Sequence, residues 1–285
     1  MKAFDLYEPK SIEDACELLE KGNGEAGILA GGTDLLVELK SGLVTLPKVI
    51  NLKRIEGLDY ITFDPKEGIR IGALATWTQI LESDEVATYY PVLKQSAQVM
   101  ASAQIRNMAT LAGNICHASP AANGPIPLLL YEAECTIQGR TGKRTIPIGE
   151  IFAGVQKNSL KPGEILVEIH MPPPPASSAK GIYQKFATRK AMDLGIAGVG
   201  VLVKWDDGSF DFVRIALAAV APTPIRARRA EKFLKGKAIE DGLIREGAEI
   251  ASKECAPISD VRASKEYRIE LVKELTYRAI KGCIM

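Results

Sequence analysis

The chain has 285 residues, enough for one large domain or for two to three small ones built around a proper core. Its 36 lysines and arginines nearly balance 35 aspartates and glutamates, so its overall charge favours neither nucleic acid nor an anionic membrane as a partner. The N-terminus does not resemble a signal peptide, and no apolar run approaches the roughly 20 residues that a membrane span needs. We therefore expect a cytoplasmic protein.

The cysteines and histidines are few and scattered. Five cysteines are spread over the chain without a CxxC pair, and His117 and His170 are the two histidines. This pattern does not favour a structural zinc or iron–sulfur site, so no metal site is predicted in this chain. Free thiols also fit a reducing compartment. Any chemistry carried out by this chain would therefore use a bound organic cofactor or no cofactor at all.

Residues 1–55 are predicted to form a β-α-β-α-β unit. The strands are Ala3–Tyr7, Ala26–Ala30 and Val49–Asn51, and the helices start after Ser11 and cover Leu35–Lys40. Ser11 is a favourable residue for capping the first helix, and Ile12, Ala15, Cys16 and Leu19 then fall on one helical face. The second strand runs directly into Ala30-Gly31-Gly32-Thr33-Asp34.

Residues 56–175 are predicted to form a second α/β lobe. Strands are expected at Ile69–Ile71, Cys135–Gln138 and Ile165–Met171, and helices are expected to begin near Thr76 and at Pro91. The stretch Gln104–Pro127 is rich in Gly, Ala and Asn and has too little periodicity to be helical throughout. With so little hydrophobic bulk, it is not expected to belong to the core.

Pro172–Pro175, followed by Ala176-Ser177-Ser178, form the clearest boundary, because consecutive prolines act as a stiff connector. Residues 176–285 are predicted to form a C-terminal domain. Asp206-Asp207-Gly208 indicates a hairpin between Ile196–Trp205 and Phe210–Ala219. Helices are predicted at about Arg226–Leu234, Glu240–Glu254 and Ser264–Lys281. The fold class is α+β.

The glycine loop Ala30-Gly31-Gly32-Thr33-Asp34, between a strand and a helix, is suited to binding an anion. Glycines permit a sharp turn and close approach, and N–H groups at a helix start favour negative charge. The loop is neither a GxGxxG fingerprint nor a P-loop. A strand–helix turn with two glycines is also common as a purely structural feature, so the motif alone does not decide between the two.

A second segment, Arg106–Ile115, again combines small residues with a hydroxyl and an amide, and Ala118–Pro125 continues in the same style. Long irregular segments in compact domains are usually functional, although a surface Ω-loop is the alternative. Four stretches resemble the FAD-binding medium subunit of the molybdenum hydroxylases, the xanthine dehydrogenase and carbon monoxide dehydrogenase family. They are Ile28–Leu36, Ile69–Ile80, Ile105–Glu134 and Asp260–Arg268.

This resemblance implies a two-lobed FAD-binding domain of the vanillyl-alcohol-oxidase/PCMH type, followed by a domain of β-sheet plus helices. The two small-residue segments would hold the FAD diphosphate. Asn123 stands where the family commonly has an acidic residue, and Met100 stands where some relatives place an aromatic residue against the flavin. The residues implied to bind the cofactor are Ile28, Leu29, Ala30, Gly31, Gly32, Thr33, Asp34, Leu35, Met100, Thr110, Ala112, Gly113, Asn114, Asn123, Leu166 and Lys185.

Structural roles remain open for several of these residues. Leu166 and Met100 fit a hydrophobic core equally well, and Lys185 fits a solvated strand, although a cation there could stabilise a reduced flavin. His117 is interpreted as a polar loop residue and His170 as structural. No residue is predicted to be catalytic, because the flavin would carry the chemistry.

The resemblance also implies partners: a large molybdopterin-binding subunit and a small subunit with two-iron, two-sulfur clusters. Electrons would pass from these clusters through FAD to an external acceptor such as NAD⁺, dioxygen or a quinone. The alternatives are a self-contained FAD-dependent oxidase or reductase, and a non-enzymatic nucleotide-binding protein.

Overall fold

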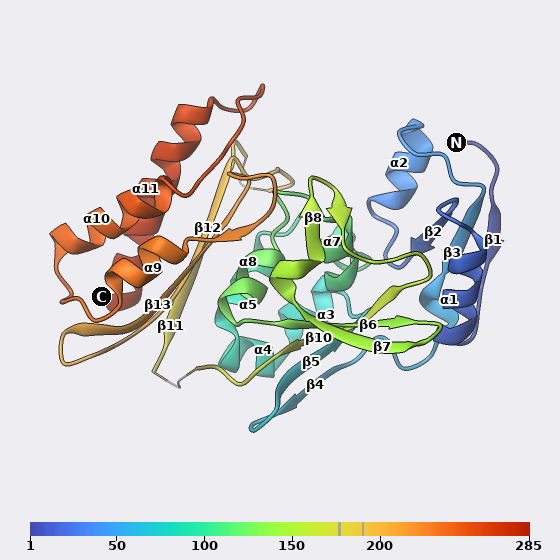
Figure 1. Cartoon of the computed structure of the whole chain (residues 1–285), viewed down its shortest axis with the longest axis horizontal. Coiled ribbons are helices and arrows are strands. Elements are labelled where there is room, and N and C mark those ends of the chain that lie inside the picture. Colours follow the sequence, from blue (N-terminus) through green and yellow to red (C-terminus); the bar gives the residue numbers. More distant parts are fainter. Residues whose placement is uncertain (176–177, 190) are drawn as a thin grey trace.

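A computed structural model describes residues 1–175, 178–189 and 191–285 (Figure 1). The N-terminal lobe lies at one end of the molecule and the three C-terminal helices lie at the other. A mixed region of helices and a five-stranded sheet connects them. The chain is thus a mixed helix and strand protein, as predicted.

The N-terminal lobe is the predicted β-α-β-α-β unit. Its parallel sheet has the order β1-β3-β2. The elements are β1 (Asp5–Tyr7), α1 (Ile12–Lys21), β2 (Ala26–Leu29), α2 (Leu35–Ser41) and β3 (Lys48–Asn51). Ser11 caps α1 as expected, since its Oγ accepts the N–H of Asp14 at 3.1 Å. Ala15 and Cys16 of α1 belong to one buried apolar cluster with Ile50 of this sheet and Ile165 of the next lobe, and this cluster joins the two lobes.

The second lobe is built on an antiparallel sheet of order β4-β5-β10-β6-β7. Its strands are β4 (Ile61–Asp64), β5 (Gly68–Gly72), β6 (Glu134–Gly139), β7 (Gly142–Pro147) and β10 (Ile165–Met171), with the small hairpin β8 (Phe152–Gly154) and β9 (Lys157–Asn158). Its helices are α3 (Trp77–Glu82), α4 (Asp84–Tyr89), α5 (Pro91–Gln98), α6 (Ala103–Arg106), α7 (Leu111–His117) and α8 (Pro125–Leu130), with the short 3₁₀ turn η2 (Ile148–Ile151). Another 3₁₀ turn, η1 (Leu52–Arg54), directly follows β3 in the N-terminal lobe. The predicted helix starts at Thr76 and Pro91 are confirmed.

The expectation that Gln104–Pro127 lies outside the core is wrong. This stretch contains part of α6, all of α7 and the start of α8, and Leu111, Ile115 and Ile126 are fully buried. Leu111 and Ile115 are four residues apart, so they share one face of a helix too short for its period to stand out in the sequence. Glycine at position 124 lets the chain pass close to α7, since an added Cβ would lie 2.9 Å from Cδ1 of Leu111.

The C-terminal domain is a four-stranded antiparallel sheet of order β11-β12-β13-β14 with three helices on one face. The elements are β11 (Lys180–Phe186), β12 (Ala197–Asp206), β13 (Ser209–Ala218), β14 (Ile225–Arg226), α9 (Arg228–Leu234), α10 (Asp241–Ser252) and α11 (Lys265–Ile284). The hairpin is confirmed: Asp207 and Gly208 both have positive φ, of 44° and 73°, as a type I′ turn requires.

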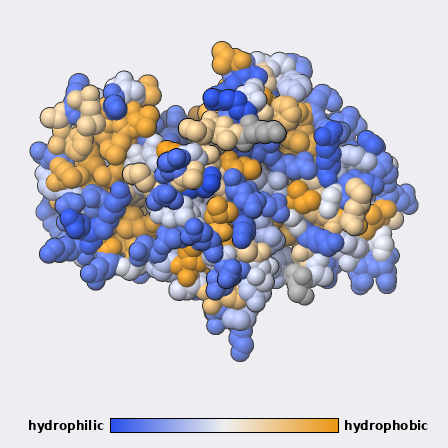
Figure 2. All heavy atoms as spheres, turned by 180° about the vertical axis from the view of Figure 1, so that it is seen from behind, coloured by the Kyte–Doolittle hydropathy of each residue, from blue (hydrophilic) through white to orange (hydrophobic). Residues whose placement is uncertain are grey.

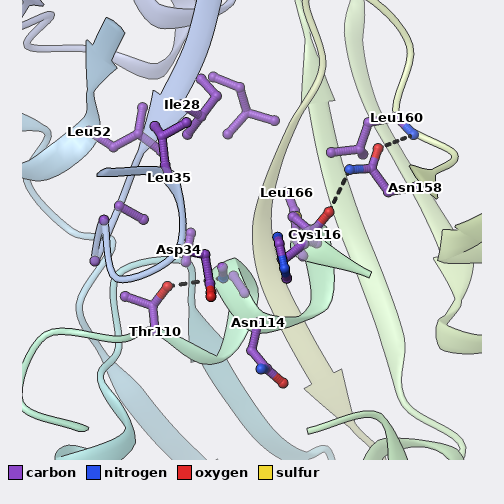
Figure 3. Close-up of a pocket in the computed structure, with 18 of the residues that line it drawn as sticks. Ile28, Asp34, Leu35, Leu52, Thr110, Asn114, Cys116, Asn158, Leu160 and Leu166 are labelled. Carbon is purple, nitrogen blue, oxygen red and sulfur yellow. Dashed lines mark hydrogen bonds between the residues drawn. The ribbon is translucent and has the colours of Figure 1, made fainter. Parts of the chain in front are cut away.

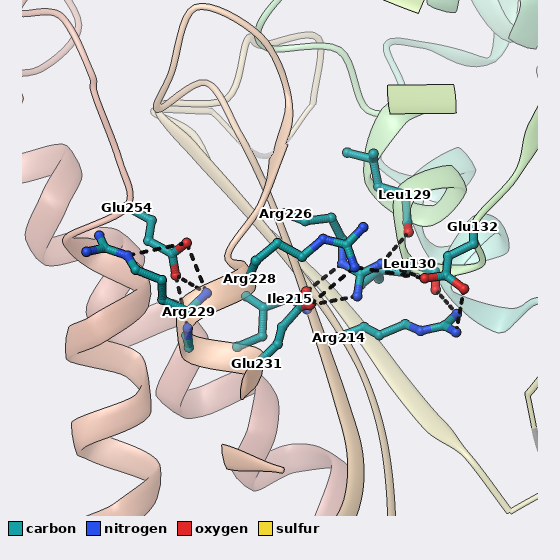
Figure 4. A network of polar contacts seen from close by, with 11 residues as sticks. Leu129, Leu130, Glu132, Arg214, Ile215, Arg226, Arg228, Arg229, Glu231 and Glu254 are labelled. Carbon is teal, nitrogen blue, oxygen red and sulfur yellow. Dashed lines mark hydrogen bonds and ion pairs between the residues drawn. The ribbon is translucent and has the colours of Figure 1, made fainter. Parts of the chain in front are cut away.

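The other face of this sheet packs directly on the second lobe. A Cβ added to Gly200 of β12 would lie 2.3 Å from Cγ2 of Ile126 in α8, so only glycine allows this approach. A polar network reinforces the junction (Figure 4). Arg226, whose side chain is 6% exposed, bonds to the Glu231 carboxylate and to the carbonyl of Leu129, while Arg214 bonds to the Glu132 carboxylate at 2.7 Å.

The domain boundary predicted at the prolines stays a prediction. Ala176 and Ser177, which belong to that predicted connector, lie outside the described residues. In the part of the chain that the structure describes, no helix has the length and apolar character required to cross a membrane. The same residues contain no group of three or more His, Cys, Asp or Glu side chains arranged as metal ligands.

Candidate functional site

A cavity of about 490 Å³ lies between the N-terminal lobe and the second lobe, a size typical of small-molecule sites (Figure 3). One wall carries Ile28, Leu35 and Leu52. Asn114 of α7 and Leu166 of β10 line the opposite side. The two small-residue segments of the sequence therefore meet at one cavity.

The glycine loop forms the N-lobe edge of this cavity. A Cβ at Gly31 would lie 2.2 Å from the carbonyl oxygen of Met108, so the loop contacts the backbone of the second segment directly. Gly32 has φ +77°, which favours glycine. The N–H groups of residues 31–35 donate to no acceptor among the described residues. These donors at the start of α2 are available to an anion.

The second segment reaches the cavity as the start of α7, and its side chains are already engaged. The Oγ1 of Thr110 accepts the N–H of Gly113 at 3.0 Å and so caps the helix. The Oδ1 of Asn114 accepts the N–H of Gly124 at 3.1 Å. Thr110 also pairs with Thr76 in a β-bridge, which anchors this segment to the start of α3.

The cavity also contains polar residues, His117 and Glu38 among them, that the sequence analysis did not assign to the site. His117 lies at the end of α7, and its Nδ1 is 3.9 Å from Oε1 of Glu38 in α2, so these two side chains approach each other from the two lobes at the cavity. Glu38 follows Asp34 by four residues and thus shares its helix face, which is the one sequence signal that could have identified it. His117 is therefore a cavity residue at a helix end, not the loop residue expected.

On the opposite wall, the Nδ2 of Asn158 donates to the carbonyl of Cys116 at 2.7 Å. Arg144 donates to both carboxylate oxygens of Glu164, at 2.8 and 2.7 Å, and these bonds hold the pKa of that carboxyl below its usual value. Burial raises the pKa of the Cys116 thiol to about 12, which favours its neutral form.

The structure brings most of the predicted site residues together and leaves three outside the lining. The lining includes Ile28, Ala30, Gly31, Gly32, Thr33, Asp34, Leu35, Met100, Thr110, Ala112, Gly113, Asn114 and Leu166. The side chain of Leu29 packs in the N-lobe core. Asn123 lies behind Met100, with its Nδ2 3.6 Å from the sulfur.

Lys185 lies in a separate hollow beside Val99, where its Nζ donates to the carbonyl of Asp193 at 2.7 Å. Burial lowers the pKa of this lysine. His170, which was expected to be structural, lies away from the cavity lining as well. Its Nε2 is 2.6 Å from the carbonyl oxygen of Glu67. The structure thus places thirteen of the sixteen residues at one cavity, and the contacts of all sixteen with a cofactor stay predictions.

Comparison with known proteins adds family information to this geometry. Residues 2–174 match the family described as the FAD binding domain in molybdopterin dehydrogenase. Residues 182–283 match the CO dehydrogenase flavoprotein C-terminal domain. The chain is 34% identical over 274 residues to a putative xanthine dehydrogenase FAD-binding subunit of Escherichia coli strain K12, covering 96% of this chain and 94% of that protein.

A second relative is the carbon monoxide dehydrogenase medium chain of Hydrogenophaga pseudoflava, 31% identical over 284 residues, with 98% of this chain and 96% of that protein covered. Among solved structures, a chain of carbon monoxide dehydrogenase from Hydrogenophaga pseudoflava, in a form that lacks the Mo-pyranopterin moiety, matches with a TM-score of 0.95 and 30% identity. That match covers 99% of this chain and 97% of the solved one.

Proposed function

Because the chain belongs to the family of FAD-binding subunits of the molybdopterin dehydrogenases, we propose that the cavity between its two lobes holds FAD. The observation that carries this proposal is the meeting of the glycine loop with the start of α7. The lobes would then form an FAD-binding domain of the vanillyl-alcohol-oxidase/PCMH type, divided near residue 55.

The residues present fit this cofactor. The free N–H groups of residues 31–35 suit a diphosphate, and the absence of a Cβ at Gly31 lets the loop remain closed against Met108. Apolar side chains such as Leu35 and Leu166 suit a planar ring. We therefore assign diphosphate binding to the glycine loop and ring contacts to the apolar walls, with Met100 among them.

When bound, FAD supplies the transfer of electrons between one-electron and two-electron partners. The chain's own residues bind the cofactor, orient it and exclude water. None of them needs to act as acid, base or nucleophile, and the protonated Cys116 thiol fits that passive role.

The proposal extends to the assembly. Relatives are described as medium chains or FAD-binding subunits of dehydrogenases. We propose that this chain works in the cytoplasm with a large molybdopterin-binding subunit and a small iron–sulfur subunit. It would pass electrons from the iron–sulfur clusters through FAD to an external acceptor.

Titration of the purified chain with FAD tests the cofactor. We expect stoichiometric binding with visible flavin absorbance, whereas a chain that fails to retain any FAD would overturn the assignment. Purification from the native source with metal analysis tests the assembly separately. Molybdenum and iron in stoichiometric partner chains are expected, and a chain that purifies alone and oxidises an organic substrate would instead indicate a self-contained flavoenzyme.

A further inference from the structure

We infer that Tyr183 on β11 is a positioning residue for the cavity: acting through Asn123, it fixes the side chain of Met100 in the wall that contacts FAD. This inference rests on the proposed FAD-binding function. It concerns a contact between the C-terminal sheet and the cavity, since Tyr183 itself is not part of the cavity lining.

Met100 is held at three points. Its N–H donates to the carbonyl of Ala97 at 3.2 Å, and its carbonyl accepts from Nη1 of Arg106 at 2.7 Å. Its sulfur accepts from Nδ2 of Asn123 at 3.6 Å. Methionine normally keeps considerable side-chain freedom, and ordering it costs entropy. The contact between the amide and the sulfur therefore restricts a side chain that lines the cavity.

Asn123 is in turn held by the C-terminal domain. Its side chain is 4% exposed, and its Oδ1 accepts from the hydroxyl of Tyr183 at 3.0 Å. Because the oxygen accepts from Tyr183, the NH₂ group is directed to the sulfur, so the two contacts fix the amide orientation. Burial raises the pKa of the Tyr183 phenol, so the hydroxyl remains a donor throughout the ordinary pH range.

The strand that carries Tyr183 is tied to the helix that leads into Met100. The N–H of Tyr183 donates to Oε1 of Gln95 in α5 at 2.7 Å, and Nε2 of Gln95 donates to the carbonyl of Gly181 at 3.3 Å. Tyr183 lies on β11 and Met100 follows the end of α5, so these hydrogen bonds join the two elements that carry the ends of the Tyr183–Asn123–Met100 series. The two hydrogen bonds, from Tyr183 to Asn123 and from Asn123 to Met100, involve only neutral groups, so they can fix the Met100 side chain without adding charge to the site.

The test compares Tyr183→Phe with wild type by the FAD dissociation rate and the visible circular dichroism of the bound flavin. Loss of the hydroxyl leaves the Asn123 amide free to turn, so we expect dissociation about 3- to 10-fold faster, the effect of one lost hydrogen bond. Tyr277→Phe is the matched control, because it removes a hydroxyl bonded to Asp241 at 2.7 Å in the C-terminal helices. The control should leave both readouts unchanged.

A double-mutant cycle identifies the route. Met100→Leu removes the sulfur acceptor at similar volume, and in that background Tyr183→Phe should change dissociation less than about 2-fold. An undiminished effect in the Leu background, or no effect in the wild-type background, would overturn the inference. If Tyr183→Phe does not fold, Asn123→Leu replaces it, because this change removes the bond to the sulfur from outside the cavity lining. It should speed dissociation in the wild-type background and by less than about 2-fold in the Met100→Leu background, and unchanged dissociation in the wild-type background refutes the role. A wild-type chain that binds no FAD refutes the proposed function instead.

Discussion

The two segments that meet at the cavity differ in how their polar groups are used. In the glycine loop, the backbone N–H groups and the Thr33 hydroxyl form no hydrogen bond among the described residues. In the second segment, Thr110 and Asn114 are both bonded within the protein. The first loop is therefore a source of donors for a ligand, whereas the second supplies a preformed surface. Variants in the glycine loop should therefore lower the affinity for FAD, and variants in the second segment should lower the free energy of unfolding.

Gly31→Val should have the largest effect, because it breaks the contact on which both segments depend. The new Cβ would meet the Met108 carbonyl at 2.2 Å and push the segments apart. We expect FAD affinity to fall by at least about 100-fold, measured by equilibrium titration. Gly149→Ala is the control, since its Cβ would have 3.8 Å to its nearest neighbour. Normal affinity in the Gly31 variant would contradict the assignment.

Asn114→Ala should act mainly on the fold. It leaves the N–H of Gly124 without its acceptor, at an expected cost of about 1–3 kcal/mol in the free energy of unfolding. Denaturant unfolding of the FAD-free protein measures this cost. Asn114→Asp keeps an acceptor oxygen and should recover most of the loss. If both variants were as stable as wild type, the distinction between the segments would fail.

Thr110→Val tests the cap of α7 in the same way. Removal of an N-cap hydroxyl costs about 1 kcal/mol, and Thr110→Ser should restore the bond to Gly113. Thermal denaturation without FAD gives the comparison. A variant with unchanged stability but impaired FAD binding would show that this hydroxyl serves the ligand and not the helix.

Thr33→Val should give the smallest effect and the opposite pattern. Its hydroxyl has no partner among the described residues, so stability without FAD should change by less than about 0.5 kcal/mol. FAD affinity should fall about 3-fold through the loss of one exposed hydrogen bond to the ligand. Unchanged affinity would restrict the ligand donors to the backbone.

Local sequence signals predicted much of this fold. The caps at Ser11 and Thr76, the start at Pro91 and the turn at Asp207-Gly208 depend on neighbouring residues, and the structure confirms them. The edge strands β4 and β7 were missed because much of their surface is exposed and their apolar pattern is weak. Short α7 was missed because its burial depends on distant neighbours.

The residues of the site also separate into those that local sequence could predict and those that depend on the tertiary fold. The glycine loop could be identified from its own residues, but the pairing of Glu38 with His117 requires the lobes to be folded against each other. Asn158 and Glu164 reach the cavity for the same tertiary reason. The roles of Asn123 and Lys185 came from resemblance alone, which does not specify side-chain direction, and both side chains lie behind or beside the cavity.

The arginine network at the junction has a consequence for how the molecule unfolds. Arg214 and Arg226, whose side chains are mostly buried, both pair with Glu132 of the second lobe, and Leu202 of the C-terminal sheet shares one buried apolar cluster with Ile126 of that lobe. Separating the C-terminal domain from the second lobe would break these ion pairs and expose that apolar surface to water. The cost of separation makes independent melting unfavourable. The second lobe and the C-terminal domain should therefore lose structure in a single cooperative transition, even though a row of prolines lies between them in the sequence.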